Sequence, residues 1–194
     1  MLTELREKYI WPETCPDVSE DPSGWLCGEN KKTLSDVITR DNPLVVLELG
    51  AWLGMSTRFL CEQTSDDCTV VTIDHWLGSS EHQTNPILPV LYETFVKNCW
   101  KYRHKLIPLR TTTLEGVREV FDADIVPNLI YVDASHETDL VIKDLDICLT
   151  LFPEATIVGD DWTWTSVKEG VFEILRKFKC DIRTFRTCYE LKIQ

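Results

Sequence analysis

Short apolar runs alternate with amphipathic segments along most of the chain. The apolar runs are rich in β-branched residues, which is typical of buried strands, and they cover Leu44–Leu49, Thr69–Asp74, Lys105–Leu109, Asn128–Asp133 and Ala155–Gly159. Helical spacing of apolar positions predicts helices between and after them, over Ser56–Gln63, Val90–Tyr102, Leu114–Phe121, Glu137–Phe152 and Val167–Phe178. Strands that alternate with helices predict an α/β fold with a doubly wound, mostly parallel sheet.

The two ends of the chain depart from this alternation. Residues 1–43 are an irregular lead-in with one helix expected around Lys31–Arg40, and we expect them to pack on a domain formed by residues 44–194. At the other end, Asp181–Phe185 and Cys188–Ile193 alternate around a short connection and predict an antiparallel hairpin. With this hairpin, the predicted sheet has seven strands.

Composition narrows the choice of partners. The 194 residues carry a net charge of −12, which argues against nucleic acid and against anionic membrane surfaces as partners. No apolar run approaches the length that spans a bilayer, so we expect a cytoplasmic protein. The eight cysteines form no C-x-x-C pair, and reduced thiols are the expected state. Oligomerisation, or a place in a larger multidomain protein, remains open.

A glycine turn links the first predicted strand to a helix. It reads Glu48-Leu49-Gly50-Ala51-Trp52-Leu53-Gly54, so Trp52 stands where a dinucleotide-binding turn would have its second glycine. Twenty residues beyond Gly54 the second strand ends in Asp74, a place where an acid accepts the hydroxyls of a ribose. A tight turn with an incidental acid explains either feature alone. The two acids, Glu48 in the first strand and Asp74 at the end of the second, together favour a cationic sulfonium cofactor over an anionic pyrophosphate.

Four acidic and imidazole side chains follow two other strands. Asp133 and His136 come after one strand, and the pair Asp160-Asp161 comes after the next. Carboxyl ends of strands in an open α/β sheet line the crevice that binds ligands, and carboxylates alone favour Mg²⁺ or Mn²⁺ over zinc. Helix capping or a solvated turn is the alternative explanation for these acids. An imidazole with a pKa of about 6.5 beside a cation suits a general base.

The glycine turn, Asp74 and the terminal hairpin together resemble the class I S-adenosylmethionine (SAM)-dependent methyltransferases. The resemblance implies a methionine site at the glycine turn, a ribose site at Asp74 and an adenine site bordered by Arg110–Thr113. The implied cofactor-binding residues are Glu48, Gly50, Ala51, Trp52, Gly54, Ser56, Asp74, His75, Thr112, Thr113 and Asp133.

The pattern D-x-x-H followed by D-D-W resembles a narrower group, the metal-dependent sugar O-methyltransferases of the macrocin and mycinamicin type. This resemblance implies that Asp133, Asp160 and Asp161 bind Mg²⁺ and that His136, with Asp133, is catalytic. Catechol-type O-methyltransferases share the three-ligand arrangement but typically use a lysine as the base.

Tryptophans near the acids are candidates for the acceptor site, because aromatic faces suit sugar rings. Trp76 follows Asp74, and Trp162 and Trp164 follow the acid pair, although tryptophan is also a frequent core residue. Loop residues 75–89 contain Gly78, Ser79 and Ser80 and are expected to form a lid.

These patterns predict a SAM-dependent O-methyltransferase that acts on a hydroxyl of a sugar or glycan. A catechol-like small-molecule O-methyltransferase and a non-catalytic cofactor-binding module remain alternatives. An NAD-dependent oxidoreductase is disfavoured by the glycine spacing and by the lack of a Tyr-x-x-x-Lys pair.

Overall fold

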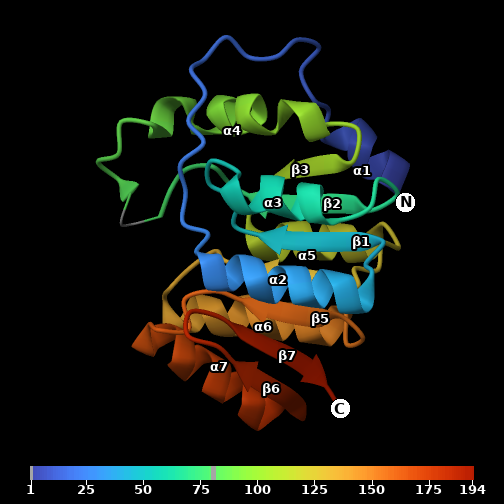
Figure 1. Cartoon of the computed structure of the whole chain (residues 1–194), viewed down its shortest axis with the longest axis vertical. Helices are drawn as coiled ribbons and strands as arrows, with labels where there is room; N and C mark the ends of the chain where they lie inside the picture. Colours follow the sequence, from blue (N-terminus) through green and yellow to red (C-terminus); the bar gives the residue numbers. More distant parts are fainter. Residues whose placement is uncertain (1, 80–81) are drawn as a thin grey trace.

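The computed structural model describes residues 2–79 and 82–194, and in them a seven-stranded sheet forms the centre of the molecule (Figure 1). The strands are β1 (Val45–Leu49), β2 (Thr69–Asp74), β3 (Leu106–Arg110), β4 (Leu129–Val132), β5 (Thr156–Gly159), β6 (Cys180–Thr184) and β7 (Tyr189–Ile193). Their order is β3-β2-β1-β4-β5-β7-β6; the pairs among β1 to β5 are parallel, and β7 pairs antiparallel with both β5 and β6. The predicted mostly parallel sheet with its C-terminal hairpin is confirmed.

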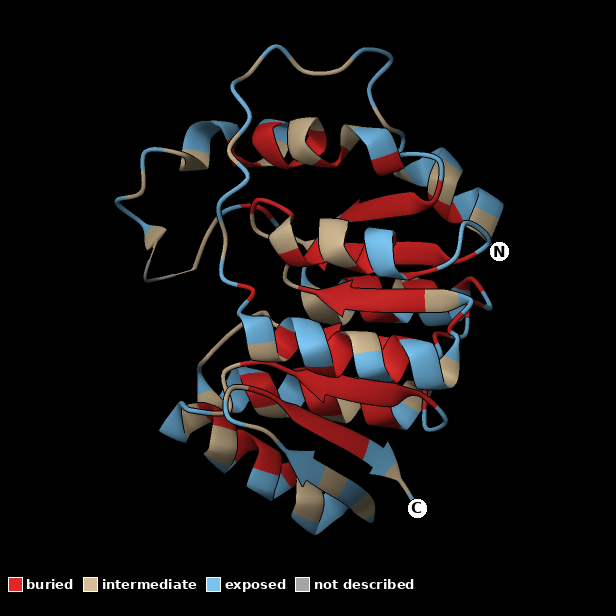
Figure 2. Cartoon of the chain, in the orientation of Figure 1, coloured by how far each residue is buried: buried red, intermediate tan, exposed pale blue. Residues whose placement is uncertain are grey.

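Helices cover both faces of this sheet. They are α1 (Leu2–Lys8), α2 (Gly28–Asp41), α3 (Met55–Gln63), α4 (Leu91–Cys99), α5 (Thr113–Asp122), α6 (Thr138–Leu151) and α7 (Thr165–Lys177). One face packs against α1, α5, α6 and α7, and the other packs against α2, α3 and α4. Figure 2 shows the buried residues along the strands and on the sides of the helices that face them. Among the described helices, none combines the length and the apolar character needed to cross a membrane.

Two predicted helices differ from the structure by more than two residues at one end. The helix expected over Val90–Tyr102 is divided: the 3₁₀-helix η2 (Leu88–Val90) precedes α4, and a second 3₁₀-helix, η3 (Trp100–Tyr102), follows it. Tightened turns of this kind are common at helix ends. The helix expected over Lys31–Arg40 begins three residues earlier, at Gly28, directly after Cys27 in an extended conformation.

An irregular segment, residues 9–27, connects α1 to α2 by way of α4 (Figure 1). Near its start, the Trp11 indole Nε1 donates a hydrogen bond to the Leu106 carbonyl at 3.0 Å. Further along, the Asn98 side chain of α4 donates to the Asp21 carbonyl at 2.6 Å and to the Leu53 carbonyl at 2.8 Å. These contacts fix the segment against α4, and its end brings Trp25 to the glycine turn.

Cysteines are used as small apolar side chains in this fold. All eight are free thiols, and five of them are buried. Cys99 and Cys148 are fully enclosed by the two apolar cores, and burial raises the pKa of both thiols. The described structure therefore relies on packing rather than on cross-links.

A buried lysine closes the carboxyl end of α3. Lys105, which precedes β3, is 4% exposed. Its ammonium group donates to the carbonyls of Cys61 at 3.2 Å, Thr64 at 3.1 Å and Ser65 at 2.6 Å. Carbonyls at the end of a helix lack partners within the helix and carry the negative end of its dipole. Lys105 satisfies several of them at once and ties α3 to the strand beside it.

We expect Lys105→Met to lower the free energy of unfolding by about 1.5–3 kcal/mol, because the buried carbonyls lose charge-assisted hydrogen bonds while the apolar volume is kept. Urea denaturation followed by circular dichroism measures this loss. Lys101→Met is the matched control, because Lys101 is exposed and pairs with Glu62 of α3. This variant should leave the denaturation midpoint unchanged. Equal midpoints for both variants would contradict the role given to Lys105.

Candidate active site

A cavity of about 1120 Å³ opens at the carboxyl ends of the central strands. Residues that follow β1, β2, β4 and β5 line it, together with residues from α5, α6 and the end of the irregular segment. The helices after β1 and after β4 lie on opposite faces of the sheet. The cavity therefore sits where the strand order reverses, between β1 and β4, which is the usual ligand site of such sheets. Pockets for small ligands occupy roughly 300–1,000 Å³. This one has room for two ligands.

Most of the predicted cofactor-binding residues lie around this cavity. The ones that line it are Gly50, Ala51, Trp52, Ser56, Asp74, His75, Thr112, Thr113 and Asp133. Two others, Glu48 and Gly54, are placed elsewhere. Gly54 caps the start of α3, and a side chain there would meet the Cys99 sulfur of α4 at 2.5 Å, so this glycine serves the packing of α3 on α4.

The glycine turn is a strained segment with an unusual residue at its centre. Gly50 and Gly54 have φ values of +85° and +83°, and Trp52 between them has a φ of 47°. Trp52 thus adopts the left-handed conformation that a glycine would adopt at lower cost. Its carbonyl accepts a hydrogen bond from the Trp76 indole Nε1 at 2.9 Å. The glycine missing from the sequence pattern is replaced by a strained tryptophan that Trp76 holds in place.

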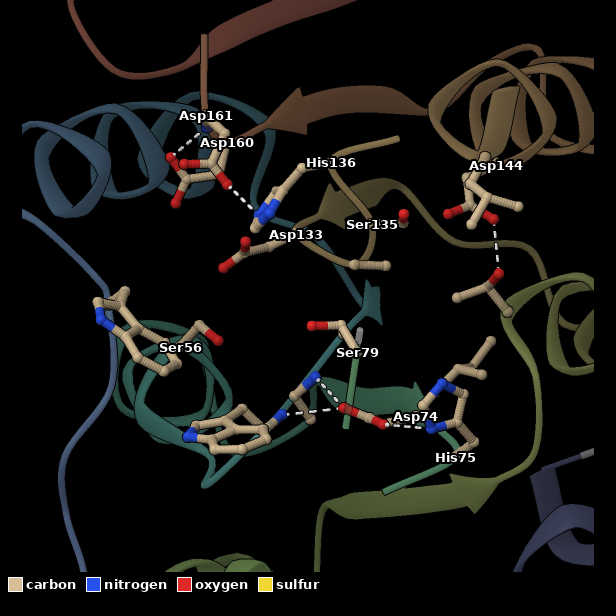
Figure 3. A pocket seen from close by; sticks show the side chains of 18 of the residues that line it. Ser56, Asp74, His75, Ser79, Asp133, Ser135, His136, Asp144, Asp160 and Asp161 are labelled. Carbon is tan, nitrogen blue, oxygen red and sulfur yellow. Dashed lines mark hydrogen bonds and ion pairs between the residues drawn. The ribbon is translucent and has the colours of Figure 1, made fainter. Parts of the chain in front are cut away.

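Asp74 connects this turn to the end of β2 (Figure 3). Its Oδ2 accepts hydrogen bonds from the backbone amides of Ala51 at 2.9 Å and Trp52 at 3.0 Å. Its Oδ1 accepts from the backbone amide of Trp76 at 2.7 Å. One carboxylate thereby sets the shape of the turn and of the loop after β2, while its side chain still borders the cavity.

Glu48 lies inside the sheet and is not among the residues that line the cavity. Side chains alternate between the faces of a strand, and Glu48 faces α3, where Thr57 Oγ1 donates to its Oε2 at 2.5 Å. It is fully buried. Burial raises the pKa of Glu48 from its ordinary 4.5 to about 7, against the opposing effect of hydroxyl groups on Ser56, Thr57 and Thr72.

An acid and imidazole cluster lies on the opposite wall (Figure 3). Ligand atoms of Asp133, His136 and Asp161 all lie within 4.8 Å of one another. His136 Nε2 is 2.8 Å from Asp161 Oδ2. Asp161 has a φ of 56°, an uncommon conformation for a residue with a side chain, and this conformation turns its carboxylate toward the histidine. The structure therefore brings together three of the four residues that the sequence singled out.

Asp160, the fourth, directs its carboxylate to other partners. Its Oδ2 accepts a hydrogen bond from the Tyr131 hydroxyl at 2.9 Å, and its Oδ1 accepts from the Asp161 backbone amide at 2.6 Å. The Asn30 side chain of α2 also bonds to it. Asp160 thus shapes the turn that carries Asp161. Neither Tyr131 nor Asn30 was predicted; Tyr131 lies two residues before Asp133, so strand alternation alone would have placed it on the same face.

Crowded carboxylates dominate the electrostatics of this wall. Burial raises the pKa of Asp133 well above its ordinary value, and the nearby charges of Asp160, Asp161 and Glu48 raise it further, while His136 opposes them. Burial is also the main reason that the pKa of Asp160 is raised. A positive charge placed among these groups would relieve both the burial and the repulsion.

The tryptophans are arranged differently from the prediction. Trp76 is 1% exposed and packs against Tyr92 and Phe95 in the core, and Trp162 packs against Phe172 and Tyr189. Neither is among the residues that line the cavity. Trp164 lines it, with its ring 4.5 Å from that of His136.

Other cavity residues escaped prediction because they come together only in the fold. Trp25 and His82 line the cavity and pack against Trp52, with ring centroids 4.3 Å apart for Trp52 and His82. Of the expected lid residues, Gly78 and Ser79 line the cavity, and Ser80 lies outside the described residues.

A family model described as a methyltransferase domain matches residues 47–162. The chain belongs to this methyltransferase domain family. The matched segment begins in β1 and ends just past Asp161, so it contains the glycine turn, Asp74 and the acid and imidazole cluster. Among curated protein sequences, none significantly matches the chain.

Solved methyltransferases share the fold of this methyltransferase domain. The O-methyltransferase TomG of Streptomyces achromogenes, solved with SAM, is 13% identical with a TM-score of 0.66 over 88% of this chain and 82% of its own. An O-methyltransferase from Bacillus cereus in complex with SAH is 15% identical with a TM-score of 0.63, over 100% of this chain and 90% of its own. A methyltransferase from Podospora anserina with bound SAH is 13% identical with a TM-score of 0.64, over 90% and 81%.

We expect Glu48→Gln to gain stability relative to the wild type as pH rises from 4.5 to 8. Below pH 4.5 Glu48 is protonated in both the folded and the unfolded chain. Between 4.5 and about 7 the unfolded chain releases the proton more readily, so rising pH favours unfolding of the wild type, and glutamine removes this penalty. The difference in unfolding free energy should grow by roughly 1.5–3 kcal/mol. Denaturant titrations of both proteins at several pH values measure it; a difference that is constant with pH would contradict the buried, protonated Glu48.

Proposed function

We propose that the chain is a SAM-dependent O-methyltransferase that methylates a hydroxyl group of a sugar or glycan with the help of a divalent cation and a histidine base. One observation carries the proposal: the glycine turn with Asp74 and the cluster of Asp133, His136 and Asp161 line the same cavity. A donor site and a deprotonation site thus face each other across a space that holds two ligands.

The donor side has the groups that SAM requires. Asp74 at the end of β2 is placed for the ribose hydroxyls, and the backbone of Gly50 and Ala51 approaches the cavity without large side chains. The acidic surroundings favour the positive charge of the sulfonium. Fold neighbours bound to SAM or SAH support the same donor for this chain.

The acid cluster fits a divalent cation. Carboxylate oxygens are the ligands that Mg²⁺ and Mn²⁺ prefer. Burial, and after it the negative charges of Asp160, Asp161 and Glu48, raises the pKa of Asp133, and a cation would relieve this repulsion. Asp133 and Asp161 would hold the cation, and Asp160, whose Oδ2 accepts a hydrogen bond from Tyr131, is the third candidate ligand. When bound, such a cation acidifies a hydroxyl group that coordinates to it.

His136 would remove the acceptor proton. Its imidazole takes the proton of the hydroxyl group, and Asp161, 2.8 Å from Nε2, stabilises the resulting imidazolium. The acceptor oxygen then bonds to the methyl carbon as the C–S bond breaks, which leaves SAH as a neutral thioether. Alignment of the two substrates by the cavity walls is expected to supply much of the rate, roughly 7–11 kcal/mol.

Aromatic walls support a ring-shaped acceptor. The Trp164 ring lies 4.5 Å from that of His136, and Trp25 and Trp52, which pack against each other, also line the cavity. Such faces pack against the C–H faces of a sugar, but they also suit a catechol ring, which makes a catechol-like acceptor the second candidate. Methyl transfer from labelled SAM to a panel of nucleotide sugars, deoxysugars, glycans and catechols separates the two. Transfer to catechols alone would contradict the sugar assignment.

We expect His136→Gln to lower kcat by a factor of about 10²–10⁴, since the general base is lost, while SAH affinity in calorimetry stays within a factor of about three. Alkaline pH should restore part of the rate, because hydroxide then replaces the base. His104→Gln is the matched control: His104 is exposed and remote from the cavity, and its kcat should equal that of the wild type. Full activity of His136→Gln would refute the base assignment.

Chelation is expected to abolish methyl transfer, and added Mg²⁺ or Mn²⁺ should restore it. Asp161→Asn should weaken Mg²⁺ binding to the SAH-loaded protein at least about tenfold in calorimetry, with SAH affinity preserved. Asp139→Asn, on the exposed first turn of α6, should leave both affinities unchanged. Methyl transfer that persists in chelator would overturn the requirement for a cation.

A further inference from the structure

The sheet ends in a free edge at β6. This strand is the last in the strand order and lies at the lower edge of the sheet in Figure 1. Within residues 2–79 and 82–194, β6 pairs with β7 alone, and the pairing continues without a bulge over all five residues. Three of these residues are exposed and two are half-buried (Figure 2). An edge strand without a proline or a bulge can accept another strand.

The backbone groups that face outward at this edge can be assigned from the hairpin. The Lys179 carbonyl accepts a hydrogen bond from the Gln194 amide at 3.0 Å, and the Phe185 amide donates to the Cys188 carbonyl at 2.8 Å. Backbone groups alternate between the two sides of a strand in an antiparallel ladder, so the odd-numbered residues of β6 direct theirs toward β7. The residues that direct their N–H and C=O groups outward are Cys180, Ile182 and Thr184.

Two opposite charges stand on either side of the middle of this strand. Asp181 and Arg183 are both exposed and share one face of the sheet, because they are two residues apart. In the hairpin, Asp181 lies opposite Lys192 and Arg183 lies opposite Glu190, with Arg183 Nη1 3.8 Å from Glu190 Oε2. Each charge thus has one oppositely charged neighbour on β7 and an open side at the edge.

The charges of β6 are complementary to those of the same strand read in reverse. A second copy of β6 that pairs antiparallel about a two-fold axis at Ile182 matches all five residues, and Asp181 of each copy then lies opposite Arg183 of the other. An axis at Asp181 or at Arg183 would match only part of the strand and would set two like charges against each other. Parallel pairing in register would do so at both positions. Opposite charges across strands are stabilising and like charges are destabilising.

The same axis also satisfies the outward backbone groups. Ile182 of each copy would exchange both backbone hydrogen bonds with Ile182 of the other, and Cys180 would do so with Thr184 of the second copy. On the face opposite the charges, the half-buried Ile182 side chain belongs to the apolar rim of the core, and the axis brings two such side chains together. Charge, hydrogen bonding and apolar contact therefore select one register.

We propose that the free edge of β6 is a dimer interface, at which two copies of this chain pair antiparallel about Ile182 and join their sheets into one. The inference does not depend on the reaction proposed above. The alternative role for Asp181 and Arg183 is to fix the register of the hairpin and to repel other strands. In that case the chain stays monomeric.

Sedimentation velocity over a dilution series measures the dimer. The wild type should dimerise reversibly with a Kd in the micromolar range, as small interfaces do. Asp181→Arg and Arg183→Asp should each raise the Kd at least about tenfold, because like charges then face each other at two symmetric positions. The double variant should recover the dimer, since opposite charges meet again. Arg118→Asp, on the exposed side of α5, is the matched control and should keep the wild-type Kd.

A cross-link tests the position of the axis. Ile182→Cys sets two thiols opposite each other with their Cα atoms about 5.5 Å apart, a separation that a disulfide spans. Mild oxidation should therefore give a covalent dimer on a non-reducing gel. The same chain with Ile182 retained is the control, because its Cys180 lies two residues from the axis. Both carry Cys27→Ser, which removes the exposed thiol.

Two outcomes would overturn the proposal. A wild type that sediments as a monomer at every concentration excludes the interface without any variant. A dimer that resists both charge reversals, with no cross-link in Ile182→Cys, places the interface elsewhere on the molecule. If circular dichroism shows that a charge variant has lost its fold, the cross-link decides alone.

Discussion

One carboxylate, that of Asp74, holds the site in shape. Its two oxygens accept three backbone amides, from Ala51 and Trp52 of the glycine turn and from Trp76 of the loop after β2. Hydrogen bonds to an ionised acceptor are stronger than neutral ones, and here they balance the cost of a left-handed tryptophan at position 52. The turn, the strand end and the loop thus form one rigid wall of the cavity.

The opposite wall depends on unfavourable electrostatics. Asp133, Asp160 and Asp161 stand close together, and burial makes their shared negative charge expensive. Strained and crowded groups of this kind concentrate at functional sites, where the rest of the fold must hold them. Tyr131 and Asn30 stabilise the charged form of Asp160 by hydrogen bonding to it, which offsets part of the cost of burying the carboxylates. The fold thereby holds these carboxylates close together in spite of their burial and mutual repulsion.

Local periodicity was enough to predict the strands and the acids at their ends. The run Thr69–Asp74 marks β2 and ends in the acid that organises the turn, and Asp133 and Asp160 come after β4 and β5 as expected. Which tryptophan faces the cavity could not be predicted in this way. Trp76 has a φ of 51°, and this left-handed conformation directs its ring into the core. Its position in the sequence, directly after Asp74 and His75, therefore does not indicate that the ring is buried away from the cavity.

Asp144, which also lines the cavity, was missed for a different reason. It sits next to Leu145 in a helix whose apolar positions predict packing, and a polar residue there resembles the solvated side of an amphipathic helix. Only the meeting of α5 and α6 shows that this position is enclosed. In the same way, Trp25 reaches the cavity because Asn98 and Trp11 hold an irregular segment in place, and no local pattern encodes that path.

Gly50 has a consequence for how this family member can change over evolutionary time. A side-chain carbon at Gly50 would lie 2.0 Å from the Asp133 carbonyl oxygen, so any substitution there pushes the chain away from the residue that begins the acid and imidazole cluster. The backbone of Gly50 thus packs directly against the backbone of Asp133. A substitution at Gly50 is therefore expected to disturb the turn and the cluster together, so the two parts of the site cannot vary independently at this position.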